Sequence, residues 1–175
     1  GQYIHYNSHP GNTLVASGGE KSDLSLDSRY ADESAIYIGN EQKLSNSITL
    51  QYGVRYSYFR SLGPGTEYAY IDNETGERKT PILPGTDYKK GEVIKSYGNL
   101  EPRFSMNVGV NPSTSLKASY NRTSQYITLL SNTAASTPLD VWALNGANIP
   151  PEKADQVAIG WFKNFKQNTY EASVE

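Results

Sequence analysis

Residues 47–58 have the sequence SITLQYGVRYSY, in which apolar or aromatic residues alternate with polar residues or glycine. The even positions are Ile48, Leu50, Tyr52, Val54, Tyr56 and Tyr58. The odd positions are Ser47, Thr49, Gln51, Gly53, Arg55 and Ser57. Because successive side chains of a β-strand point to opposite faces, this alternation predicts one long strand with an apolar face and a polar face.

The same period of two recurs along the chain. Residues 99–110, NLEPRFSMNVGV, alternate in the same way and carry Glu101 and Arg103 on the polar face. Shorter alternating runs lie at residues 4–7, 115–121, 156–161 and 169–175, and residues 35–40 form a further strand whose facing stays open. We therefore expect an all-β fold of about seven antiparallel, up-and-down strands. The two long runs exceed the roughly five or six residues usual in soluble sheets and suit a tilted membrane strand of roughly 9 to 11 residues.

The predicted connections alternate in length. Residues 41–46, 111–114 and 166–168 are short turns, whereas residues 8–33, 61–97 and 126–154 are long, polar loops. Short turns at one end of the strands and long loops at the other are typical of outer-membrane barrels, whose long loops lie outside the cell.

A soluble β-sandwich is the main alternative, because its strands also alternate but bury their apolar faces in a shared core. Periodicity alone leaves the two architectures about equal. The polar faces of the long strands carry Arg55, Glu101 and Arg103, as expected of a water-filled lumen, and this favours the barrel. We expect these charges to pair across neighbouring strands rather than to form an acid–base site.

Composition excludes several classes of protein. The hydrophobic fraction is 37%, the formal net charge is -2 and the mean hydropathy is -0.61, and no apolar run approaches the roughly 18 to 20 residues of a membrane-spanning helix. The positive and negative charges are nearly balanced, and no run of basic residues is present that could bind along a phosphate backbone. No nucleic-acid partner is therefore expected. There is no cysteine, and the two histidines, His5 and His9, are interpreted as surface residues. With no Gly-x-Ser-x-Gly motif either, we expect no catalytic residue, no metal and no cofactor, and we interpret the chain as a non-enzyme.

Several segments together resemble a known family. Residues 33–44, ESAIYIGNEQKL, and residues 50–56, LQYGVRY, resemble paired barrel strands of TonB-dependent receptors, with Arg55 as the arginine of the family's Tyr-Gly-hydrophobic-Arg-Tyr pattern. Residues 97–105 look like the next descending strand and residues 115–123 like its ascending partner. The later segments are similar to the branch of the family with long extracellular loops: residues 130–133, 138–142, 154–160 and 170–175. The resemblance covers the chain from about residue 31 onward.

The resemblance implies a transmembrane barrel of about 22 strands with a plug in its lumen. Such a receptor lies in the outer membrane of a Gram-negative bacterium, in contact with outer-membrane lipid. It imports a scarce nutrient, such as a metal chelate, a vitamin or a glycan, and is driven by the TonB complex through its N-terminal plug. Seven strands make about a third of that barrel, so we expect residues 1–175 to form one partial barrel domain without the plug or the TonB box.

A sheet of seven strands cannot close, and its two edges expose unpaired backbone groups. We expect the isolated fragment to self-associate by pairing its edges with another copy, or to fold its apolar faces onto each other like a sandwich.

The predicted loops are rich in aromatic residues, and aromatic rings stack on sugars and chelates. Tyr68, Tyr70, Tyr126 and Trp142 are therefore our candidate ligand-contacting residues, with packing within the loop as the alternative for each. Two other functions stay open from the sequence: a soluble carbohydrate-binding β-sandwich module, and a structural or adhesive surface domain.

Overall fold

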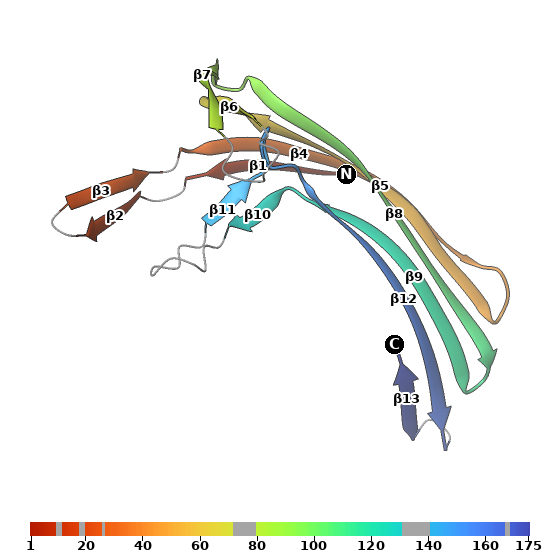
Figure 1. Cartoon of the computed structure of the whole chain (residues 1–175). Coiled ribbons are helices and arrows are strands. Elements are labelled where there is room, and N and C mark those ends of the chain that lie inside the picture. The colour runs from red at the N-terminus through yellow and green to blue at the C-terminus, as the bar shows by residue number, and fades with distance from the viewer. Residues whose placement is uncertain (10–11, 18–19, 26, 72–79, 131–140, 167–168) are drawn as a thin grey trace.

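A single antiparallel sheet of seven strands dominates the computed structural model, which describes residues 1–175 except 10–11, 18–19, 26, 72–79, 131–140 and 167–168. The sheet consists of β1 (Gln2–Ser8), β4 (Arg29–Lys43), β5 (Ile48–Leu62), β8 (Val93–Asn111), β9 (Thr114–Gln125), β12 (Glu152–Phe165) and β13 (Tyr170–Val174). The strands are hydrogen-bonded in this order, so each one pairs with the next along the sheet (Figure 1). All seven predicted strands and the up-and-down topology are therefore confirmed. None of the described residues belongs to a helix long and apolar enough to cross a membrane.

Each long connection contains a two-stranded hairpin that lies at the same end of the sheet (Figure 1). The hairpins are β2 (Asn12–Ser17) with β3 (Glu20–Ser25), β6 (Gly65–Ile71) with β7 (Thr80–Tyr88), and β10 (Ile127–Leu130) with β11 (Val141–Leu144). The sheet strands also reach into the predicted loop ranges, since β4 begins at Arg29, β5 ends at Leu62 and β8 begins at Val93. The ranges 8–33, 61–97 and 126–154 are thus partly strand.

The short turns lie at the opposite end of the sheet, and local side chains stabilise them. Ser45 Oγ accepts hydrogen bonds from the backbone N–H groups of Ser47 and Ile48. Asn111 Oδ1 accepts from the N–H of Ser113, a turn in which an Asn side chain replaces a backbone acceptor. Lys166 has a φ of 48°, which closes the turn before β13.

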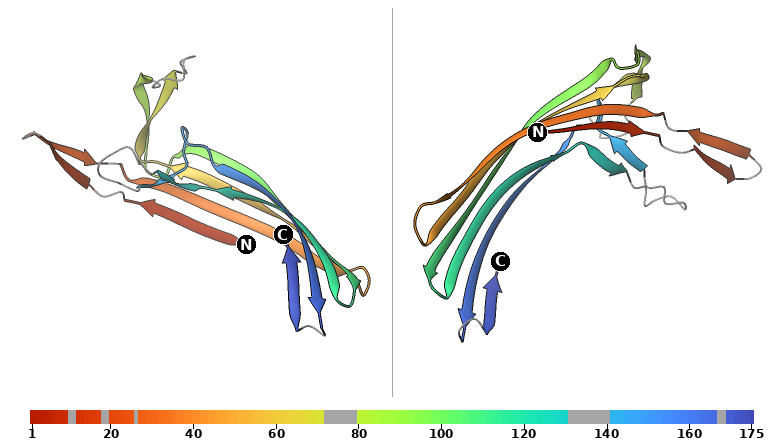
Figure 2. Two further views of the ribbon diagram at one scale, coloured as in Figure 1. Left: turned by 60° about the horizontal axis from the view of Figure 1, so that its bottom comes forward. Right: turned by 180° about the vertical axis from the view of Figure 1, so that it is seen from behind.

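The two faces of the sheet have the burial pattern opposite to that of a soluble protein. The convex face carries the apolar residues, and they are exposed: Ile38 is 74%, Leu100 61% and Ile159 71% exposed. The concave face carries polar residues, and those nearest the hairpins are buried, among them Ser57 at 0% and Glu101 at 2% exposure, whereas Gln51, Arg103 and Asn107 nearer the short turns are exposed. Figure 2 shows this curvature from two further directions. An uncovered apolar face suits lipid rather than water.

The convex apolar face has the height of a membrane. On β5 it extends from Ile48 to Tyr58, which spans about 33 Å along the strand at about 3.3 Å per residue. A strand tilted by about 40° covers about 25 Å of that length along the membrane normal, the height of the apolar band of outer-membrane barrels. Residues 35–40, whose facing the sequence left open, place Ile36 and Ile38 on this band, opposite Tyr56 and Val54.

The sandwich expectation is wrong, both for the fragment and for the alternative soluble module. Continuous antiparallel ladders join β4, β5, β8, β9 and β12 in turn, so the sheet curves as one layer and does not fold back on itself. The apolar side chains consequently have no second sheet to pack against. Among the described residues, β1 and β13 are the edges of the sheet; pairing of these edges with a second copy stays a prediction.

Candidate functional site

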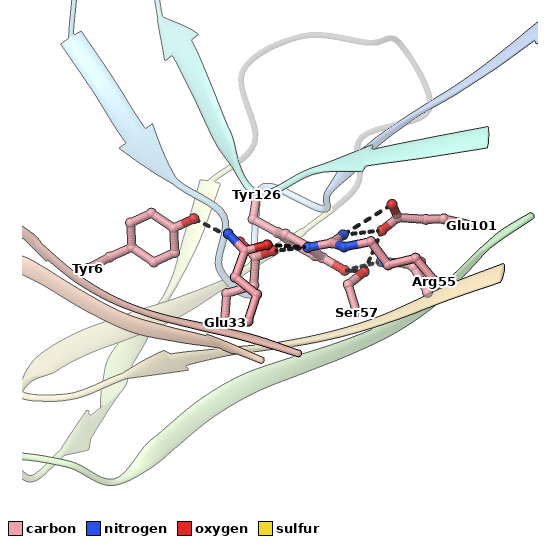
Figure 3. A network of polar contacts seen from close by, with 8 residues as sticks. Tyr6, Glu33, Arg55, Ser57, Glu101 and Tyr126 are labelled. Carbon is pink, nitrogen blue, oxygen red and sulfur yellow. Dashed lines mark hydrogen bonds and ion pairs between the residues drawn. The ribbon is translucent and has the colours of Figure 1, made fainter. Parts of the chain in front are cut away.

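Arg55 lies at the centre of a polar network on the concave face (Figure 3). Its Nη1 donates to both carboxylate oxygens of Glu101, at 2.8 and 3.1 Å, and its Nη2 donates to Glu33 Oε1 at 2.8 Å. Glu101 on β8 is directly opposite Arg55 in the sheet register, whereas Glu33 lies further along β4. The predicted cross-strand pairing is therefore confirmed for Arg55 and Glu101.

Hydroxyl groups complete the hydrogen bonding of the two carboxylates, and a tyrosine and an amide extend the network. Ser57 Oγ donates to Glu101 Oε1 at 2.6 Å, and the Tyr6 hydroxyl donates to Glu33 Oε2 at 2.7 Å. Because the proton of Ser57 is directed to the carboxylate, the Tyr126 hydroxyl donates to Ser57 Oγ, 2.6 Å away, and accepts from Asn99 Nδ2 at 2.8 Å. The charged groups of this network, two carboxylates and one guanidinium, sum to one formal negative charge.

The network anchors the connection between β9 and β12, which contains the β10–β11 hairpin, to the concave face of the sheet. The Tyr126 ring, immediately before β10, stacks parallel on Phe59 with a centroid distance of 4.8 Å, and both residues are buried. Immediately after β11, Asn145 donates through its N–H to the Tyr126 carbonyl at 3.0 Å, and Gly146 accepts a 2.7 Å hydrogen bond from the Tyr97 hydroxyl. The connection therefore lies against the concave wall.

A concavity opens between this connection and strands β1 and β4. We call it the aromatic concavity, and its described lining residues are Tyr6, Glu33, Thr123, Ser124, Gln125, Tyr126, Ile127 and Trp142. The candidates Tyr126 and Trp142 both line it, but they differ in exposure: Tyr126 is 3% exposed and Trp142 is 60% exposed. Most of the Tyr126 ring packs against the wall, whereas the Trp142 ring is accessible.

The other two candidates lie elsewhere. Tyr68 and Tyr70 are exposed side chains of β6, in the β6–β7 hairpin, outside the aromatic concavity. The structure thus brings two of the four predicted contact residues together and keeps the other two apart. β6 and β7 pair as a hairpin, and residues 72–79 between them lie outside the described residues.

Phe59 and Glu33 were missed by the sequence reasoning. Phe59 directly follows Tyr58 and falls on the polar, odd-numbered face of the 47–58 strand. An aromatic residue at a position expected to be polar is a detectable break in the alternation, and it indicates that another element covers that point of the wall. Glu33 offered no such signal, because a carboxylate on either face of a strand end is ordinary.

A second polar cluster ends the convex apolar face near the hairpins. Asp32 accepts hydrogen bonds from the Tyr3 hydroxyl at 2.9 Å and Arg60 Nη2 at 3.0 Å, and its Oδ1 lies 2.7 Å from His5 Nδ1. On β9 and β12 the ion pair between Arg122 and Asp155, at 2.7 Å, has the same position beyond the apolar residues. These ionic groups lie just beyond the apolar residues of the convex face, where the edge of the membrane's hydrocarbon region is expected.

A comparison with protein families agrees with this geometry. The family model described as outer membrane beta barrel domain matches residues 13–171. No curated protein and no solved structure matches the chain.

Proposed function

Because the chain belongs to the outer membrane beta barrel domain family and lies in the outer membrane, we propose that it forms part of the barrel wall of a TonB-dependent receptor that imports a scarce nutrient. The nutrient is a metal chelate, a vitamin or a glycan. In a barrel of about 22 strands, the other strands would pair outward from the edge strands β1 and β13.

The observation that carries this proposal is the connection held against the concave wall. An open diffusion channel works with a water-filled lumen, whereas here Tyr126 and Phe59 stack on the inner wall and a buried ionic network supports them. A connection fixed to the inner surface of the wall suits a receptor that selects its solute and is energised. The resemblance of residues 33–56 and 97–123 to barrel strands of this receptor family supports the same assignment.

We assign the ionic network a structural role and no catalytic one. Glu33 and Glu101 each accept hydrogen bonds from Arg55 and from a hydroxyl group, so neither carboxylate is held in readiness for proton transfer to a solute. The chain is accordingly proposed to be a transporter part and not an enzyme. Its energy source is the TonB complex, acting through the plug.

Two measurements on the complete protein test this function. In planar lipid bilayers we expect far smaller conductance than an open porin gives, because a plug fills the lumen. In cells that express the protein, uptake of labelled ferric chelates, cobalamin or oligosaccharides should require the TonB complex and should stop when a protonophore collapses the proton gradient. Large, stable conductance together with uptake that continues in the presence of the protonophore would instead identify a diffusion channel.

A further inference from the structure

We propose that the aromatic concavity binds a neutral sugar ring, so that the imported nutrient is a glycan rather than an anionic chelate. This inference rests on the proposed import function and narrows its substrate class.

Trp142 supplies the stacking surface. It lies on β11 with 60% of its surface exposed, although Tyr126 in the same connection is almost fully buried. The connection that carries Trp142 is itself fixed by the Phe59–Tyr126 stack and by the Tyr97–Gly146 hydrogen bond. The indole is therefore held at the concave wall. The face of an aromatic ring is electronegative, and it attracts the weakly positive C–H groups on the flat side of a pyranose.

Uncharged polar groups surround this indole. Thr123, Ser124 and Gln125 at the end of β9 line the same concavity. Side chains alternate along β9, so Thr123 and Gln125 share the concave face with Ser119, and Ser124 lies on the convex face with Arg122. An aromatic surface next to a few convergent hydroxyl and amide groups is the usual composition of a specific small-molecule site.

The charges of the described lining residues disfavour an anion. Among the described residues that line the concavity, Glu33 is the charged one. The nearby cation, Arg55, is already shared between Glu33 and Glu101, and the network keeps one formal negative charge. An anionic chelate next to Glu33 would meet this net negative charge and no free cation among the described lining residues.

A cation is not favoured either. The two oxygens of Glu33 already bind Arg55 and the Tyr6 hydroxyl, so the guanidinium of Arg55 already compensates the charge that would attract a cationic solute. A neutral ring with several hydroxyl groups matches both the exposed indole and the uncharged polar residues of the lining.

The test uses the complete receptor, purified in detergent, and isothermal titration calorimetry. The probes are four neutral hexasaccharides, namely maltohexaose, cellohexaose, xylohexaose and mannohexaose, each at about 1 mM, a concentration that detects even weak single sites, with ferric citrate as the anionic comparison. We expect at least one neutral hexasaccharide to bind and ferric citrate not to bind. Binding of ferric citrate alone, or of none of the four saccharides, overturns the proposal.

Variants then assign the binding to this site. Trp142→Ala should weaken the affinity at least about tenfold, Trp142→Phe should keep most of it, and Tyr70→Ala, which removes an exposed aromatic ring outside the concavity, should change it less than about twofold. Folding of each variant is checked by its heat-modifiable migration in gels. Equal affinities for Trp142→Ala and Tyr70→Ala would show that the sugar binds elsewhere.

The two proposals fail separately. Protonophore-sensitive uptake of a ferric chelate, without saccharide binding, leaves the import function intact and removes the glycan assignment. Saccharide binding that depends on Trp142, without energy-dependent uptake, keeps the site and removes the import function.

Discussion

Arg55 separates two buried carboxylates, so its removal has a defined cost. In Arg55→Ala, Glu33 and Glu101 lose the cation between them, and breaking a buried ion pair in this way costs about 3–5 kcal/mol. We expect the free energy of unfolding of the complete protein to fall by about that amount. Urea titration of the protein in lipid vesicles, followed by tryptophan fluorescence, measures the change.

Arg103 provides the matched control. It is an exposed arginine of β8, directly opposite Gly53 on β5, the strand that carries Arg55. Arg103→Ala should change the free energy of unfolding by less than about 0.5 kcal/mol. Similar losses of stability in the two variants would show that the ionic network around Arg55 stabilises the sheet no more than an exposed arginine does.

At the scale of single residues, the sequence predicts those contacts that depend only on strand register. Arg55 and Glu101 share the polar face of neighbouring strands, and their direct opposition follows from the alternation. The contribution of Tyr126 could not be predicted in the same way. It depends on a connection that folds back over Phe59, and that path is set by tertiary packing between segments about 70 residues apart.

The β4–β5 pair depends on two glycines that face each other. Gly39 and Gly53 are partners in the ladder, and a Cβ on Gly53 would lie 2.7 Å from the Ile38 carbonyl oxygen and 3.0 Å from the Gly39 Cα. Both atoms belong to the backbone, so Gly53→Ala must push the strands apart. We expect a loss of about 1–3 kcal/mol, as for other overpacked sites, measured by the same urea titration.

Gly109 is the control for that substitution. A Cβ on Gly109 would approach its nearest neighbour, the Ser47 carbonyl oxygen, only to 3.7 Å, an ordinary contact. Gly109→Ala should therefore fold with nearly unchanged stability. Equal losses for Gly53→Ala and Gly109→Ala would mean that close approach of β4 and β5 is not the cause.

When the Tyr126 side chain is removed, the connection that contains β10 and β11 should detach from the concave face of the sheet. Tyr126→Ala eliminates the stack on Phe59 and the hydrogen bonds to Ser57 and Asn99. We expect faster amide hydrogen exchange in β10 and β11, with exchange in β6 and β7 unchanged. Tyr68→Ala, at an exposed position of β6, serves as the control. Unchanged exchange in β10–β11 of Tyr126→Ala would contradict the anchoring role.

The strands were predictable and the hairpins largely were not, for one physical reason. A strand that crosses the membrane must alternate strictly, because lipid lies on one side and a polar interior on the other. Beyond the apolar band this constraint ends: Asp32 and Arg60 lie on the convex side and pair with each other. The sequence signal therefore weakens just where β4, β5 and β8 continue into the loop ranges and where the hairpins form.

At the scale of the molecule, the sheet has two edge strands, β1 and β13, and within the described residues each leaves a row of backbone donors and acceptors unpaired. We expect residues 1–175, refolded alone in detergent, to self-associate as these edges pair. Analytical ultracentrifugation over a range of protein concentrations should show dimers or larger species. A monomer at every concentration would refute edge pairing by the fragment and would leave the family assignment untouched.

The orientation of the whole sheet toward lipid is tested by two neighbouring residues. Ile159 and Ala158 on β12 are both exposed, but Ile159 lies on the convex face between Val157 and Trp161, and Ala158 lies on the concave face opposite Ser119. If both faces met water, an arginine would be tolerated equally at either position. With lipid on the convex side, Ile159→Arg should cost about 2–4 kcal/mol, whereas Ala158→Arg should cost less than about 0.5 kcal/mol. Urea titrations of the complete protein in vesicles measure this difference, and equal tolerance of the two arginines would remove the physical basis for a membrane-facing convex surface.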